Sequence, residues 1–189
     1  MDFEIRLERL NSIVHNFCDG HYEPYDSAED EPSVICSKIC IEGENIGSIR
    51  LYELYNDKNF FSFLDSVSGD CSVIACVICG KSGAVLKKYL SDESEYDLVY
   101  VLDQITIDKK FRNCGIGSVI IKNLLKMINY QFGRGSTVFL CASDYETAKQ
   151  YGFESSEYKE GTNRLIEFYK KLGFRIVKDN IMVYTEKDI

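Results

Sequence analysis

Residues 104–125, QITIDKKFRNCGIGSVIIKNLL, contain the residue types of a phosphate-binding turn. A β-branched run ends at Asp108, a basic hexapeptide follows over 109–114, and Gly115 and Gly117 lead directly into an apolar pattern with helical spacing. Glycines at such a junction leave backbone N–H groups accessible, and the first N–H groups of a helix lack internal partners. Together with Arg112 they could bind phosphate oxygens. A tight turn with solvated basic residues would use the same residue types.

Two other phosphate-binding motifs fit this segment less well. A Walker loop needs a lysine directly after its last glycine, and Ser118 follows Gly117. A dinucleotide-binding turn needs a third glycine at the position of Ile120. The pattern that is present is R-x-x-G-x-G over 112–117.

The elements around this turn are predicted to be a strand, a helix and a strand. Residues 96–107 are apolar nearly throughout, as in a central strand covered on both faces. The pattern predicts a helix over 116–130 and a second strand over 136–143. This order makes a βαβ unit with parallel strands. The residues expected on the buried helix face are Ile116, Val119, Ile120, Leu124 and Ile128.

The N-terminal part predicts a hairpin and a helix. Phe3–Leu10 alternates weakly and fits a strand or a short helix, whereas the acidic residues and prolines of 19–32 predict a loop. Two strand-type runs flank a turn at 42–45. Most of 58–79 has the apolar spacing of a helix, with Gly69 as a weak point.

The C-terminal part predicts a short helix and a hairpin. Residues 144–161 are polar, mostly acidic and without a clear period. A helix is expected over 162–172 with Thr162 as its N-cap. The last two strand-type runs, FRIV and IMVYTE, are joined by a turn at 178–180.

The composition limits the classes of partner. The chain has 189 residues and a net charge of −8, which argues against broad binding to nucleic acid or to an anionic membrane. The charge is compatible with a cationic substrate, and the acidic stretches 19–31, 92–97 and 144–160 could attract one. The charged N-terminal decapeptide does not resemble a signal peptide, so we expect a cytoplasmic protein. The oligomeric state stays open.

The eight cysteines are expected to be reduced. Most lie in apolar segments, where a thiol behaves as a small buried hydrophobe. Cys76 and Cys79 have the spacing of metal ligands, but no second pair follows, and structural zinc usually takes four ligands. We therefore expect core packing, no disulfide framework and no metal.

Two blocks of this chain resemble the GNAT superfamily, the general N-acetyltransferases. Residues 105–125 resemble the acetyl-CoA-binding segment of that superfamily, a strand, a V-x-P-x-[YF]-R-x-x-G-[IL]-G loop and a helix, with Lys109 in place of the proline. Residues 164–177 are similar to its late F-Y-x-K-x-G-F segment. The matching residues are Phe111, Arg112, Gly115, Gly117, Phe168, Tyr169, Lys171, Gly173 and Phe174.

The resemblance implies a fold for the whole chain. We expect a single GNAT-like domain over 1–189 in the α/β class, with a twisted and mostly antiparallel mixed sheet. One parallel βαβ unit would lie at the acyl-CoA site, and helices would cover both faces. The acyl-CoA-binding core would span 96–186, and the half formed by 1–95 is less standard.

The resemblance also implies a reaction, which is transfer of an acetyl group from acetyl-CoA to an amine acceptor, a small molecule or a peptide. Tyr169 matches the residue that protonates the departing thiolate in many members. From the residues themselves, Asp103, or a water held by Gln104, could accept the proton of the amine. An acyl-CoA sensor or scaffold without turnover is the alternative. The expected cofactor-binding residues are Ile105, Ile107, Arg112, Asn113, Cys114, Gly115, Ile116, Gly117 and Ser118.

Overall fold

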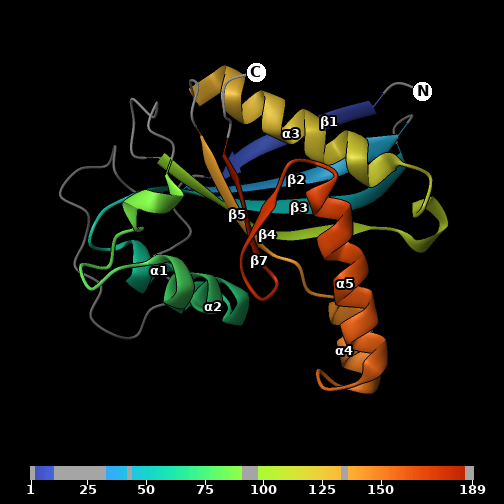
Figure 1. Cartoon of the computed structure of the whole chain (residues 1–189). Coiled ribbons are helices and arrows are strands. Elements are labelled where there is room, and N and C mark those ends of the chain that lie inside the picture. Colours follow the sequence, from blue (N-terminus) through green and yellow to red (C-terminus); the bar gives the residue numbers. More distant parts are fainter. Residues whose placement is uncertain (1–2, 11–32, 42–43, 91–97, 133–135, 186–189) are drawn as a thin grey trace.

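The structure is a computed structural model, which describes residues 3–10, 33–41, 44–90, 98–132 and 136–185. These residues form a seven-stranded sheet in the order β1-β2-β3-β4-β5-β7-β6, with helices on both faces (Figure 1). Among the described strands only β4 and β5 pair in parallel; every other neighbouring pair is antiparallel. The predicted mixed α/β class is therefore confirmed, including the parallel βαβ unit.

The strands follow the predicted runs closely. Phe3–Leu10 is a strand, and the hairpin and the C-terminal strand pair form as predicted. The predicted loop over 19–32 lies outside the described residues. The strands are β1 (Phe3–Leu10), β2 (Ser33–Ile41), β3 (Glu44–Tyr55), β4 (Leu98–Ile107), β5 (Thr137–Cys141), β6 (Arg175–Lys178) and β7 (Ile181–Thr185).

The helix predicted over 58–79 is two helices, because Ser68 takes an extended conformation and caps the second one by accepting a hydrogen bond from the Cys71 N–H. The helices are α1 (Phe60–Val67), α2 (Gly69–Ile78), α3 (Ile116–Phe132), α4 (Tyr145–Tyr151) and α5 (Ser156–Lys170). Single 3-10 turns are η2 (Lys87–Tyr89) and η3 (Lys109–Phe111).

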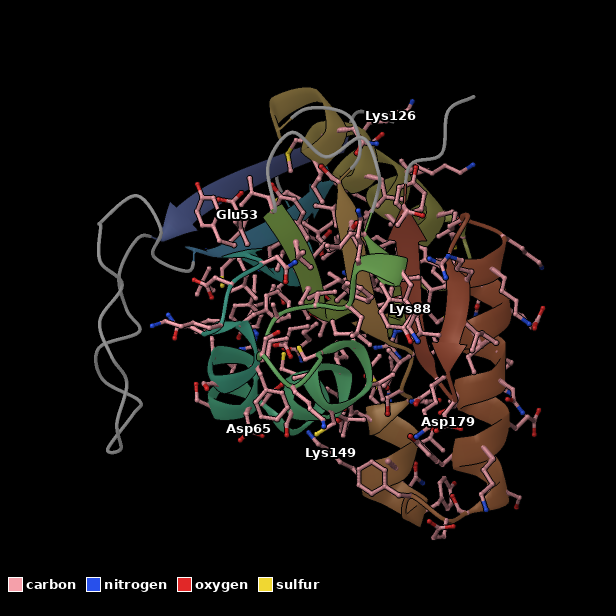
Figure 2. All side chains as sticks on the ribbon, turned by 60° about the vertical axis from the view of Figure 1, so that its left-hand side comes forward. Glu53, Asp65, Lys88, Lys126, Lys149 and Asp179 are labelled. Atoms are coloured by element: carbon pink, nitrogen blue, oxygen red, sulfur yellow. The ribbon has the colours of Figure 1, made fainter. Side chains whose placement is uncertain are left out.

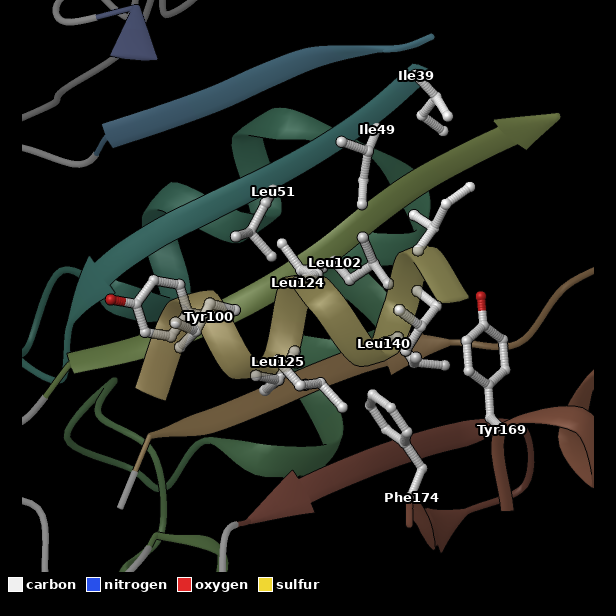
Figure 3. Packing of buried hydrophobic residues seen from close by; sticks show 14 of the residues in the cluster. Ile39, Ile49, Leu51, Tyr100, Leu102, Leu124, Leu125, Leu140, Tyr169 and Phe174 are labelled. Carbon is white, nitrogen blue, oxygen red and sulfur yellow. The ribbon is translucent and has the colours of Figure 1, made fainter. Parts of the chain in front are cut away.

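Two hydrophobic cores lie on opposite faces of the sheet. On one face α3 and α5 pack against the sheet, and Figure 3 shows Leu124 and Leu125 of α3 beside Leu102 of β4 and Leu140 of β5. On the other face α1 and α2 pack against the sheet, and side chains fill the space between these helices and the strands (Figure 2). Each face therefore holds one helical layer against the same central strands.

The predicted start of the helix over 162–172 was wrong, and residues 144–161, for which no element was predicted, are largely helical. This polar stretch forms α4 and the first turns of α5, and α5 begins at Ser156 with Ser155 as its N-cap. Thr162 is buried within the helix, where its hydroxyl accepts a weak hydrogen bond from the Asp144 N–H (3.4 Å). Gly161 permits this close approach, because a Cβ at Gly161 would lie 2.1 Å from Asp144 Oδ2. Packing of α4 against α5 thus stabilises helices that have little apolar pattern.

Two finer predictions about burial also need correction. Val119 is 37% exposed, and Ile121 and Leu125 are buried on α3 instead. Strand β4 is buried on both faces only from Val99 to Leu102, whereas Gln104 and Thr106 are exposed. The second half of β4 therefore leaves the layered core, and the candidate site is built around it.

Candidate functional site

The parallel strands β4 and β5 part in the middle of β4. Their register ends at Leu102 opposite Leu140, and among the described residues β4 then continues to Ile107 with β3 as its only strand partner. A β-bulge lies at the same point. Arg50 pairs with Gln104 and Leu51 with Leu102, which leaves Asp103 as the extra residue. A bulge bends its strand, so β4 turns away from β5 here.

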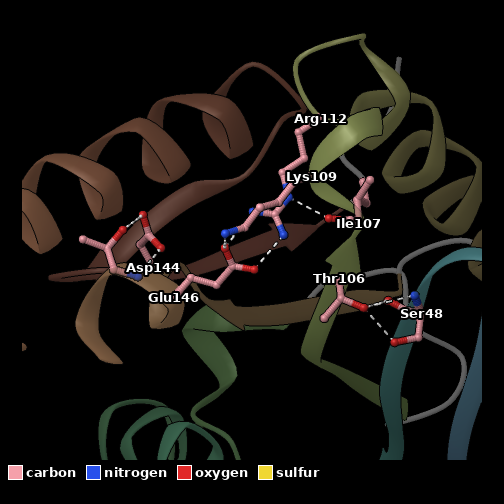
Figure 4. Close-up of polar contacts among 8 residues, drawn as sticks. Ser48, Thr106, Ile107, Lys109, Arg112, Asp144 and Glu146 are labelled. Atoms are coloured by element: carbon pink, nitrogen blue, oxygen red, sulfur yellow. Dashed lines mark hydrogen bonds and ion pairs between the residues drawn. The ribbon is translucent and has the colours of Figure 1, made fainter. Parts of the chain in front are cut away.

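The end of β4 presents main-chain groups on its free edge. In an antiparallel pair the N–H and C=O groups point alternately toward and away from the partner strand. Since the Asp108 N–H donates to the Ile46 carbonyl, the main-chain groups of Ile107 and Ile105 point away from β3. The Ser48 and Thr106 hydroxyls lie 2.8 Å apart and join β3 to the same part of β4 (Figure 4).

The turn over 112–117 takes a special backbone conformation. Asn113 and Gly115 both have positive φ, 61° and 80°, and a Cβ on Gly115 would meet no atom within 4 Å. The N–H groups of Ser118 and Val119 bond to the Gly115 carbonyl, so those of Ile116 and Gly117 lack partners within the helix. The turn thus presents main-chain donors beside an open surface.

The remaining predicted residues of the turn differ in exposure. Asn113 and Cys114 are exposed, and the Cys114 thiol donates to the Arg112 carbonyl at 3.4 Å. Ile116 is buried in the α3 core, and Ser118 is half-buried. Gly117 faces inward, since its Cβ would lie 3.4 Å from the Phe168 ring and 3.6 Å from Ile107. Gly117 therefore brings the turn close to α5, whereas Gly115 keeps the outer surface open.

Arg112 joins the turn to both the β4 end and α4. Its Nε donates to the Ile107 carbonyl at 2.6 Å, and Nη1 and Nη2 donate to the two Glu146 oxygens at 2.9 and 2.7 Å (Figure 4). Lys109 Nζ lies 3.9 Å from the same carboxylate. The hydrogen bonds with Arg112 lower the pKa of Glu146 below its ordinary value and raise that of Arg112. The guanidinium is thus held by a bidentate pair.

Tyr169 is a buried phenol without a hydrogen-bond partner among the described residues. It is 6% exposed and makes edge-to-face contacts with Phe168 and Phe174, with ring centroids 5.1 and 5.5 Å away. Figure 3 shows its ring beside Leu140, with the hydroxyl pointing away from Phe174. Burial raises the pKa of Tyr169 to about 12, so it stays protonated at neutral pH. Buried phenol hydroxyls usually find a hydrogen-bond partner. Since the Tyr169 hydroxyl has none among the described residues, it is available to a ligand.

Asp103 is held by three donors on the face that α2 covers. Its Oδ2 accepts from Arg50 Nε at 2.5 Å, and its Oδ1 accepts from the Ser68 hydroxyl at 3.0 Å and the Cys71 thiol at 3.4 Å. The side chain is 4% exposed. Asp103 thus links the bulge in β4 to the first turn of α2. If Asp103 acts as a base, it does so while already accepting these hydrogen bonds.

We expect Asp103→Asn to lower the free energy of unfolding by about 2 kcal/mol, because it leaves Arg50 without its ion pair and weakens the bonds from α2. Urea denaturation would measure this. Gln104→Ala is the matched control, since Gln104 accepts only a weak bond of 3.3 Å from Arg50 on the exposed side. Equal stability of Asp103→Asn and the native chain would contradict a linking role for Asp103.

Glu146 was missed because residues 144–161 lack apolar periodicity. A local signal does exist. Asp144 is the N-cap of α4 and accepts from the Thr147 N–H at 3.1 Å and from its hydroxyl at 2.8 Å, with Glu146 in the first turn. Aspartate followed by an acidic first turn is a typical helix start. That signal would have found the helix, but not the pairing with Arg112.

The described cysteines are all free, and no three His, Cys, Asp or Glu side chains within the described residues come together to hold a metal ion. Cys76 is exposed and Cys79 is half-buried, so the pair does not pack as one unit in the core. Burial raises the pKa of the Cys71 thiol to about 12. Among the described residues, no helix is long and apolar enough to cross a membrane.

No protein-family model matches the chain, and no curated protein matches it. The solved structures that it resembles include a GNAT family acetyltransferase from Elizabethkingia anophelis with acetyl-CoA bound, at 13% identity over 96% of this chain and 98% of that chain, with a TM-score of 0.40. Arabidopsis thaliana NAA60 in complex with a bisubstrate analogue matches at 14% identity over 97% and 100%, with a TM-score of 0.43.

A mutant of the AtaT toxin bound to the C-terminus of the antitoxin AtaR matches at 12% identity over 80% of this chain, with a TM-score of 0.39. That match spans 66% of the AtaT chain, which is slightly less than two thirds of its length. Because all these TM-scores are below 0.5 and the identities are below 25%, the likenesses assign no activity to this chain. The case for an activity therefore depends on the residues and geometry of the chain itself.

Proposed function

We propose that this chain is an N-acyltransferase that transfers an acetyl group from acetyl-CoA to a primary amine. The observation that carries the proposal is the free edge of β4 beyond Leu102, where the parallel strands part. One end of this edge meets the turn over 112–117, whose N–H groups and Arg112 suit a diphosphate. The buried Tyr169 hydroxyl, without a partner among the described residues, adds a proton donor to the same α3–α5 side of the sheet.

In this proposal the turn binds the diphosphate of CoA. The donors would be the N–H groups from Asn113 to Gly117 at the N-terminus of α3. The Ser118 hydroxyl would add a donor, since the Ser118 N–H already bonds to the Gly115 carbonyl. The pantetheine arm would pair with the main-chain groups of Ile105 and with the Ile107 N–H, which point away from β3, while the Ile107 carbonyl accepts from Arg112 Nε. A main-chain N–H on this edge would also stabilise the negative oxygen of the tetrahedral intermediate.

The reaction needs two proton transfers. A primary amine is protonated at neutral pH and must lose a proton before it attacks the thioester carbonyl. The proposed acceptor of that proton is Asp103 or a water held by Gln104. The amine nitrogen forms a bond to the carbonyl carbon, the C–S bond breaks, and the departing thiolate takes a proton from Tyr169. No metal takes part in this scheme.

The acceptor is proposed to be an amine on a small molecule or a peptide. Of the acidic stretches considered from the sequence, 19–31 and 92–97 lie outside the described residues. Within 144–160, Glu154 pairs with Lys159 and Glu146 pairs with Arg112, so part of this negative charge is already neutralised inside the chain. The net charge of −8 supports a cationic acceptor more than any one of these stretches does.

The test of the proposed function has two stages. Calorimetric titration of the native chain with acetyl-CoA should give saturable binding at one site, and a mixture of amines should then release free thiol from acetyl-CoA. Binding without thiol release across varied amines would favour the alternative, an acyl-CoA sensor of the same fold. Absence of any binding would overturn both.

A further inference from the structure

Arg112 is already engaged by an acidic side chain of its own chain. Both terminal nitrogens of the guanidinium donate to Glu146, and the Lys109 ammonium lies 3.9 Å from the same carboxylate. A carboxylate and a phosphate offer a guanidinium the same bidentate geometry. Arg112, which the proposed function assigns to the CoA phosphates, therefore holds an internal anion in this structure.

Glu146 is positioned by contacts of the two residues that precede it. Asp144 caps α4 two residues before Glu146, and the Tyr145 hydroxyl donates to Asp70 of α2 at 2.5 Å. The N-terminus of α4 is thus anchored to α2 through Tyr145, independently of Arg112. Because of this anchor, Glu146 can leave Arg112 by rotation of its side chain while the helix stays in place.

The pair is accessible to a competing anion. The Arg112 side chain is 38% exposed and the Glu146 side chain is 58% exposed. Exposed ion pairs contribute little to stability because both groups are well solvated when apart. Arg112 also keeps its hydrogen bond to the Ile107 carbonyl, which orients the guanidinium without Glu146.

We propose that Glu146 is an internal competitor for the phosphate site: its carboxylate occupies Arg112 and Lys109 until the phosphates of acyl-CoA displace it, and it thereby sets the affinity of the chain for acyl-CoA. This inference rests on the proposed function. It gives α4, which lies outside the motif over 112–117, a role in setting the affinity for acyl-CoA.

Calorimetric titration with acetyl-CoA tests the proposal. Glu146→Gln removes the charge but keeps the size of the side chain, and it should bind acetyl-CoA roughly two- to fivefold more tightly than the native chain. Glu154→Gln is the matched control. It removes the same charge from the turn between α4 and α5, where Glu154 pairs with Lys159, and it should leave the dissociation constant unchanged.

A double variant separates direct competition from a general effect of charge. In the Arg112→Gln background, adding Glu146→Gln should produce much less tightening than in the native chain, because the bidentate partner for which the two anions compete is gone and only Lys109, 3.9 Å from the carboxylate, remains. The competitor role would be overturned if Glu146→Gln bound acetyl-CoA no more tightly than the native chain, or if Glu154→Gln tightened binding as much as Glu146→Gln. In either case, acetyl-CoA binding by the native chain would still support the proposed function. If no variant and no native chain binds acetyl-CoA, the proposed function fails and the competitor role fails with it.

Discussion

Tyr169→Phe should lower kcat about a hundredfold or more and leave the dissociation constant of acetyl-CoA unchanged. The substitution removes only the hydroxyl that we propose protonates the departing thiolate, and loss of a positioned general acid typically costs about 10²- to 10⁴-fold in rate. The ring contacts with Phe168 and Phe174 do not involve the hydroxyl, so they persist. Steady-state kinetics and calorimetry would measure the two quantities separately.

Stability provides a second measurement on the same variant. Because the Tyr169 hydroxyl has no partner among the described residues, its removal should not lower the free energy of unfolding. Tyr158→Phe is the control on the same helix, since its hydroxyl lies 2.9 Å from the Ser143 hydroxyl. It should lose stability and keep its activity. Unchanged kcat in Tyr169→Phe would remove Tyr169 from the mechanism.

Tyr169 also predicts a pH dependence of stability. Its pKa is raised from 10.0 in the unfolded chain to about 12 in the folded chain. The folded state therefore holds the proton more tightly, and the associated stabilisation is complete below pH 10 and is lost as the pH rises from about 10 to about 12. Tyr169→Phe should lack this part of the alkaline loss when the two unfolding profiles are compared.

Gly115→Glu should reduce acetyl-CoA binding below detection, because it places a carboxylate on the outer surface of the turn where the diphosphate is proposed to bind. Its φ of 80° adds a conformational cost of about 1 kcal/mol for any other residue. A Cβ there meets no atom within 4 Å, so the substitution should not disturb packing. Calorimetry would measure binding, and thermal unfolding would confirm that the variant is folded.

Gly152→Glu is a closely matched control for Gly115→Glu. Gly152 lies in the turn between α4 and α5 and has a φ of 89°, and a Cβ at this position would likewise meet no atom within 4 Å. Both variants therefore introduce the same charge at a glycine of positive φ, but only one lies at the proposed phosphate site. Equal acetyl-CoA affinity of Gly115→Glu and Gly152→Glu would refute binding of the diphosphate at the turn.

Of the two variants, only Tyr169→Phe bears on the difference between the enzyme and the sensor. A sensor needs the turn but does not need a proton donor, so Gly115→Glu would abolish binding in both cases. Tyr169→Phe would lower a reaction rate only if the chain releases thiol from acetyl-CoA. Thiol release by the native chain, and its loss in Tyr169→Phe, therefore decide between the proposed function and its alternative.

The sequence alone predicted the elements whose signals are local. The apolar run of β4, the glycine turn and the start of α3 were predictable because periodicity and glycine conformation depend on adjacent residues. The parallel pairing of β4 with β5 followed from the order of strand, helix and strand. The same logic failed for α4, where polar residues form a helix that packing against α5 stabilises.

Only the tertiary structure decided which groups meet at the site. Asp103 is bound by Arg50 and Ser68, which lie 53 and 35 residues away along the chain, and Arg112 is bound by Glu146, which lies 34 residues away. The bulge at Asp103 also depends on the register with β3. Such contacts have no local pattern, because they arise from the packing of separate elements. The hydrogen-bond partners and the availability of the predicted site residues therefore became known only from the folded chain.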